Sequence, residues 1–91
     1  MRAKFEEGRY QERLRSGNLS PIVRDDKHPA PPHQPFCTRS QMIEYQNRQG
    51  RKVALVHQYL RPDGTVGASG KPDPKAIWTS RRYYYVSRKA D

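Results

Sequence analysis

Two runs of strand-forming residues flank a turn sequence, and this pair limits the fold more than any other feature of the chain. Residues 41–46 and 52–60 are rich in β-branched and aromatic side chains, and residues 47–50 between them read Asn-Arg-Gln-Gly. Gly50 can adopt the positive φ that a hairpin turn needs. Alternation divides the second run between two faces, one with Val53, Leu55, His57 and Tyr59 and the other with Ala54, Val56, Gln58 and Leu60. Because both faces are apolar at its centre, we expect this run to be a central strand.

A third strand is predicted near the end of the sequence. Residues 61–64 read Arg-Pro-Asp-Gly, which is typical of a turn, and residues 65–74 contain the glycines and prolines of a loop. The run 75–88 then returns to strand-forming residues. We therefore expect residues 40–91 to form a small antiparallel β domain of three strands, which is about the minimum for a stable sheet.

Two different segments precede this predicted sheet. Residues 1–17 predict a charged N-terminal helix, with Tyr10 and Leu14 on one side and Phe5 roughly opposite. Residues 18–39 contain five prolines, which exclude a regular helix and favour an extended connector that lies as a strap along the domain. The predicted fold class is therefore α+β, with an N-terminal helix, an extended Pro-rich strap and a small three-stranded antiparallel sheet.

The composition allows only a small core. Leu, Ile, Val and Phe number 14 of the 91 residues, and the formal net charge is +9. This balance is typical of chains whose flanks are weakly held until a partner binds. Cys37 is the single cysteine, so no disulfide forms within the chain. No apolar run approaches the roughly 20 residues of a membrane span, and the first residues lack an apolar signal region, so we expect a cytoplasmic protein with no membrane contact.

A cationic and aromatic tract carries the strongest functional signal. Residues 61–91 hold seven Lys or Arg against three Asp, and residues 78–86 read Trp-Thr-Ser-Arg-Arg-Tyr-Tyr-Tyr-Val. Cations neutralise phosphates and aromatic faces stack on bases, so we expect a non-enzymatic protein that binds nucleic acid, either DNA or RNA, or a nucleoprotein complex. As a strand, the tract would place Tyr83 and Tyr85 on one face and Tyr84 on the other. The residues expected to contact the partner are Lys71, Lys75, Trp78, Arg81, Arg82, Tyr83, Tyr84, Tyr85, Arg88 and Lys89.

Two other functions fit the same composition. Aromatic and arginine side chains are also enriched at protein interfaces, so a protein-interaction module, such as an inhibitor of the host-takeover type, would dock this surface on an acidic protein. A small toxin-like ribonuclease that needs no metal would use His57 as its acid or base. The spacing of His28, His33 and Cys37 matches no zinc module, so we expect no metal site and no cofactor.

Overall fold

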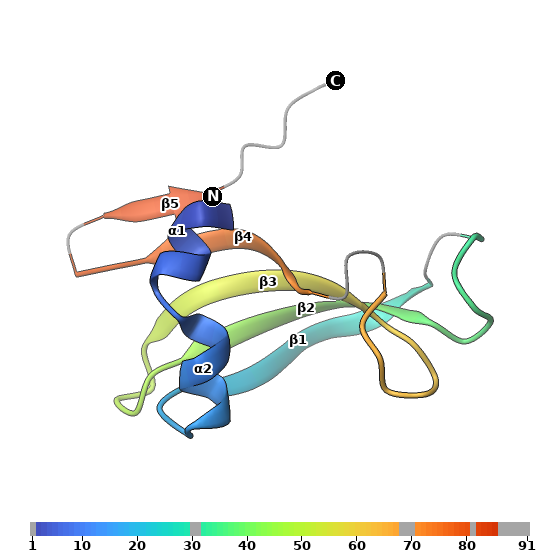
Figure 1. Cartoon of the computed structure of the whole chain (residues 1–91), viewed down its shortest axis with the longest axis horizontal. Coiled ribbons are helices and arrows are strands. Elements are labelled where there is room, and N and C mark those ends of the chain that lie inside the picture. Colours follow the sequence, from blue (N-terminus) through green and yellow to red (C-terminus); the bar gives the residue numbers. More distant parts are fainter. Residues whose placement is uncertain (1, 30–31, 68–70, 81, 86–91) are drawn as a thin grey trace.

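The computed structural model describes residues 2–29, 32–67, 71–80 and 82–85. In these residues the chain forms two short helices and a sheet of five antiparallel strands (Figure 1). The elements are α1 (Arg2–Glu7), α2 (Tyr10–Arg15), β1 (Ser20–Pro29), β2 (Arg39–Gln46), β3 (Lys52–Leu60), β4 (Asp73–Trp78) and β5 (Tyr83–Tyr85). Each strand pairs with the next one along the chain, so the sheet is a meander. The predicted α+β class is confirmed, whereas the predicted count of three strands is wrong.

The hairpin of β2 and β3 forms the centre of the sheet, as the sequence predicts. In its register Ile43 pairs with Val56, and both side chains are buried. In the turn, Gly50 has a φ of 80° and donates its N–H to the carbonyl oxygen of Asn47 at 3.0 Å. The neighbours of β3 are β2 and β4, which confirms that β3 is a central strand.

Strand β1 corrects the prediction of a proline-rich strap. Residues 20–29 lie within the segment expected to be a connector, yet they pair with β2 along the edge of the sheet. Proline cannot donate a hydrogen bond to a sheet ladder, so it is confined to edge strands and strand ends. Pro21 and Pro29 satisfy both conditions because they lie near the two ends of an edge strand. Between them, Val23 pairs with Ile43, which makes the segment part of the sheet.

The N-terminal segment is two helices rather than the single predicted helix. Gly8 and Arg9 separate them, and Arg9 has left-handed backbone angles, φ 53° and ψ 38°. The break redirects the chain, so Phe5, which was expected opposite Tyr10, stacks on the Tyr10 ring with centroids 5.0 Å apart. Leu19 is buried in the same cluster, so the N-terminal flank supplies part of the core. Each helix has six residues, and no helix in the described part of the chain is long and apolar enough to cross a membrane.

The two faces of the sheet differ in what lies against them. Both helices pack on one face, here called the covered face (Figure 1). The core on this face consists of Phe5, Tyr10, Leu19, Ile43, Tyr45, Ala54, Val56 and Ile77. Because successive residues of a strand point to opposite faces, the neighbours of these core positions lie on the other face, here called the open face. The open face carries Met42, Leu55, His57, Trp78, Tyr83 and Tyr85.

Candidate functional site

Three aromatic rings from β4 and β5 lie in a row on the open face, and we call this row the aromatic ladder: Trp78, Tyr83 and Tyr85. Strand pairing places Trp78 opposite Tyr83. The ring centroids of Trp78 and Tyr83 are 5.2 Å apart with an interplanar angle of 18°, and those of Tyr83 and Tyr85 are 5.2 Å apart with an angle of 21°. Tyr83 is 53% exposed and Tyr85 is 61% exposed. The predicted shared face of the two tyrosines is confirmed, and both side chains are open to solvent.

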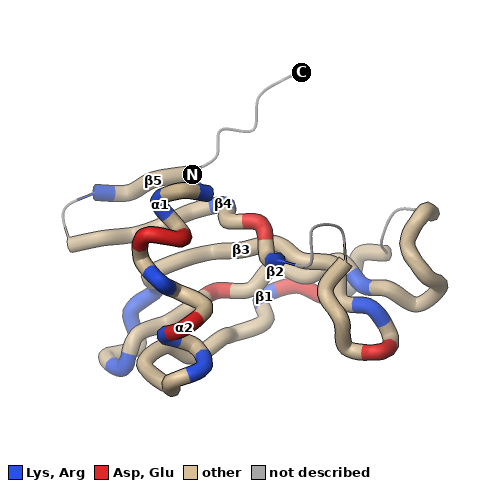
Figure 2. Tube along the Cα trace, viewed as in Figure 1, with Lys and Arg blue, Asp and Glu red and all other residues tan. Residues whose placement is uncertain are grey.

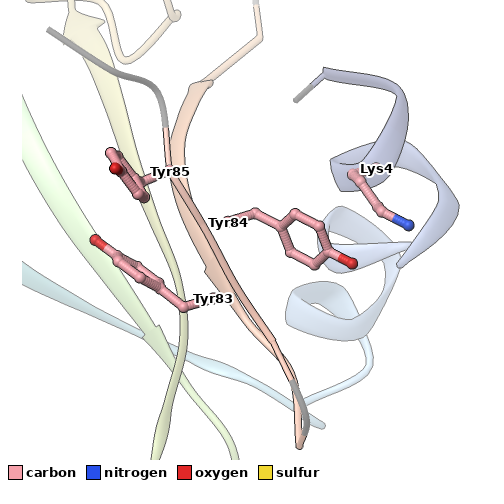
Figure 3. Close-up of a pocket in the computed structure, with 4 residues that line it drawn as sticks. All are labelled: Lys4, Tyr83, Tyr84 and Tyr85. Atoms are coloured by element: carbon pink, nitrogen blue, oxygen red, sulfur yellow. The ribbon is translucent and has the colours of Figure 1, made fainter.

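Tyr84 points the other way, toward the helices (Figure 3). Its ring is half-buried against the core, and the Nζ of Lys4 lies 5.1 Å from the ring centroid. Lys4 and the three tyrosines line a hollow of about 310 Å³ along the short edge strand. Of the three consecutive tyrosines, Tyr84 therefore anchors β5 to α1, and only Tyr83 and Tyr85 contribute to the ladder.

Two turns at one end of the sheet carry an excess of positive charge. Residues 47–52, at the β2–β3 connection, and the described residues 79, 80 and 82, between β4 and β5, contain four Lys or Arg and no Asp or Glu. We call these two segments the cationic turns (Figure 2). Arg51, Lys52 and Arg82 are exposed. An anionic partner that approaches this end of the sheet therefore meets no acidic side chain within the described residues of the turns.

Lys52 joins the cationic turns to the aromatic ladder. Its Nζ lies 4.6 Å from the centroid of the Trp78 ring, a geometry in which the ring's negative face attracts the ammonium group by about 0.5–1 kcal/mol at an exposed site. From this contact the ladder continues through Tyr83 to Tyr85. A positive charge and a row of aromatic rings thus lie side by side.

Helix α2 and the cationic turns line a hollow of about 370 Å³. Three cations line it, Arg13 from α2 and Arg51 and Lys52 from the first turn, together with Tyr10 and Trp78. None of the three cations belongs to the site expected from the sequence. Arg13 is far from the others along the chain, and the hollow exists only once α2 packs on the sheet, so no local sequence pattern could have found it.

The lysines expected at the site lie close to acidic side chains. The Nζ of Lys71 is 3.6 Å from Glu6 Oε1, and that of Lys75 is 2.8 Å from Asp73 Oδ2. Their charges are therefore partly neutralised within the chain. Arg82 is exposed, and its backbone N–H donates to Thr79 Oγ1 at 2.9 Å, which holds the second cationic turn. The other cations expected at the site lie outside the described residues: Arg81, Arg88 and Lys89.

His57 lies on the open face in the middle of β3. Its Nε2 is 2.6 Å from Ser40 Oγ, and its ring meets the ring of Tyr59 edge-on with centroids 4.8 Å apart. Burial lowers the pKa of His57, the charge of Lys75 lowers it further, and Asp73 opposes part of the shift. The imidazole is therefore neutral near pH 7, and its direct partners are a hydroxyl group and a phenol ring. The use of His57 in RNA cleavage stays a prediction.

Comparisons with known proteins give no further guide to function. No family model matches the chain, and neither a curated protein nor a solved structure similar to it is found. Within the described ranges, no three His, Cys, Asp or Glu side chains come together as a possible metal site. The geometry of the open face and the cationic turns is therefore the guide to function.

Proposed function

We propose that the protein binds nucleic acid through the aromatic ladder and the cationic turns. The observation that carries the proposal is that the exposed, stacked rings of Tyr83 and Tyr85 lie on the same sheet as two turns without acidic residues. Aromatic rings stack on any base, while Lys and Arg neutralise the phosphates beside it. A duplex hides its base faces within its own stack, so the ladder favours a single-stranded segment.

The distribution of charge supports the same choice. Acidic side chains elsewhere on the sheet are already paired: Arg24 binds Glu44 at 3.0 Å and Arg39 binds Asp26 at 3.2 Å. The hydrogen bond from Arg24 is the main reason that the pKa of Glu44 is lowered, with a smaller contribution from the nearby charge of Lys52. The cationic turns contain no Asp or Glu, so they are one place where the positive charge of the +9 chain is in excess.

The test removes the two tyrosines of the ladder and measures the affinity for a single-stranded oligonucleotide. Tyr83→Ala combined with Tyr85→Ala should weaken binding of a short fluorescein-labelled oligouridine or oligothymidine, measured by anisotropy at low salt. The free energy of binding should become less favourable by about 1–3 kcal/mol for each base that stacks on one of these tyrosines. The matched control is Phe36→Ala, which removes a 92% exposed ring from the turn before β2 and should leave the affinity unchanged. Thermal melts of each variant would separate lost binding from lost folding.

Two results would contradict the proposal. One is a folded parent protein with no measurable affinity for DNA or RNA at low salt. This result would favour the alternative that the surface docks on an acidic protein. The other is a ladder variant that remains folded and binds as tightly as the Phe36 variant, because the exposed rings would then play no part. A salt dependence that is steep for the parent and unchanged in the ladder variant is expected, since tyrosines release no counterions.

A further inference from the structure

The hollow between α2 and the cationic turns has the size and chemistry of a small-ligand site. Its volume of about 370 Å³ lies near the lower end of the roughly 300–1,000 Å³ that such sites occupy. Arg13, Arg51 and Lys52 bring positive charge to it from two elements, and Trp78 also lines it. Asn47, Thr79 and Ser80 add polar groups to the lining. An anion with a polar body fits this lining better than an apolar ligand does.

The contacts that hold Arg13 at the hollow leave its charge uncompensated. Arg13 donates from Nε to Asn18 Oδ1 at 3.0 Å, and its guanidinium carbon lies 5.2 Å from the centroid of the Tyr10 ring. Both contacts are with uncharged groups. Among the residues that the structure describes, no carboxylate forms an ion pair with any of the three cations that line the hollow.

The turn that presents Arg51 is also fixed in shape. The Oδ1 of Asn47 accepts hydrogen bonds from the backbone N–H groups of Gln49 and Arg51, both at 3.0 Å. These two bonds close the turn on itself and set the position of the Arg51 Cα. A ligand in the hollow therefore meets a preformed backbone, which lowers the ordering cost of binding.

We infer that this hollow binds a phosphate group attached to a sugar. The inference rests on the proposed function, in which a strand lies along the ladder, and it names the part of the strand that occupies the hollow. Phosphate takes charge-assisted hydrogen bonds from Arg and Lys together, and the sugar lies against Trp78 and the polar side chains of the turns. The phosphate comes from within the strand or from its end.

The first experiment needs no nucleic acid. Trp78 is the only tryptophan in the chain, so its fluorescence reports on the hollow that it lines. Titration with ribose 5-phosphate should change the emission of Trp78 saturably, whereas ribose and NaCl at matched ionic strength should not. Arg51→Gln should weaken the response by about tenfold, the loss expected for one charge-assisted hydrogen bond. The control is Arg15→Gln, which removes the same charge from an exposed position of α2 that does not line the hollow.

The second experiment places the hollow on the strand. Arg51→Gln should reduce the slope of log K against log salt for a short oligouridine by about 0.7, the value for one phosphate contact on a single strand. Oligouridines with a 5′-phosphate, with a 3′-phosphate and with neither distinguish the sources. If Arg51→Gln reduces the slope equally for all three strands, an internal phosphodiester occupies the hollow. If the slope falls for only one phosphorylated strand, the phosphate at that end occupies it.

Two outcomes would overturn the inference: a Trp78 emission that does not respond to ribose 5-phosphate, or losses that are the same for Arg51→Gln and Arg15→Gln in folded proteins. The second result would show that only the general charge of this region matters. A parent that responds to ribose 5-phosphate and binds no strand would refute the proposed function while supporting the hollow as a phosphate site. Failure of the hollow and failure of the function are therefore separate results.

Discussion

Phe5→Ala tests whether the helices are an integral part of this small domain. Phe5 is 3% exposed, its ring stacks on Tyr10 with centroids 5.0 Å apart, and it lies 6.2 Å from the ring of Tyr45 on β2. Truncation of a buried Phe to Ala costs about 3–5 kcal/mol, a large part of the roughly 5–15 kcal/mol that stabilises a typical domain. At about 4–8 °C per kcal/mol for a chain of this size, the melting temperature should fall by about 12 °C or more.

Urea unfolding followed by circular dichroism measures this loss directly. The matched control is Phe36→Ala, the same chemical change at the other phenylalanine of the chain, which is 92% exposed. This control should change the free energy of unfolding by no more than about 0.5 kcal/mol. If the Phe5 variant unfolds at the same urea concentration as the Phe36 variant, α1 is not docked on the sheet, and the reasoning from the ring contacts is refuted.

Two further predictions concern the turn and the pH dependence of stability. Gly50→Ala should destabilise the hairpin by roughly 1–2 kcal/mol, because its φ of 80° is left-handed, and an unchanged melting temperature would contradict the assigned turn. Burial lowers the pKa of His57 below its ordinary 6.5, so the unfolded chain takes up a proton more readily than the folded one, and stability should fall as the pH drops below about 6.5. Urea midpoints between about pH 7 and 5 should fall more steeply for the parent than for His57→Gln, and parallel curves would exclude this contribution.

The hairpin could be predicted from the sequence because its signals are short-range. Alternation between Leu55 and Val56 determines which side chain faces the core, and Gly50 meets a local requirement of the turn. Strand β1 could not be predicted in the same way. Prolines at positions 21 and 29 restrict the local backbone and argue against a central strand, but they do not show that β2 leaves an edge at which such a segment can pair.

The site could be predicted only in part for a related reason. Alternation along β5 is local, so the shared face of Tyr83 and Tyr85 follows from the sequence. The number of charges along a segment is also local information, and it places Lys71 and Lys75 in the predicted site. In the structure both lysines lie close to acidic side chains. Arg13 lines the hollow only through the packing of α2 on the sheet, and no segment of the sequence contains that information.

The face on which a residue lies predicts whether its substitution changes the stability of the protein or its binding. The core depends on side chains of the covered face, such as Val56 and Ile77, whereas the ladder and the cationic turns lie at the open face and one end of the sheet. Substitutions at Tyr83 or Tyr85 should therefore alter binding with little effect on folding. Tyr84 is the exception because it joins the ladder strand to α1 through Lys4. Since β5 has only three residues and lies at the edge of the sheet, a loss at Tyr84 should displace its two neighbours and reduce stability and binding together.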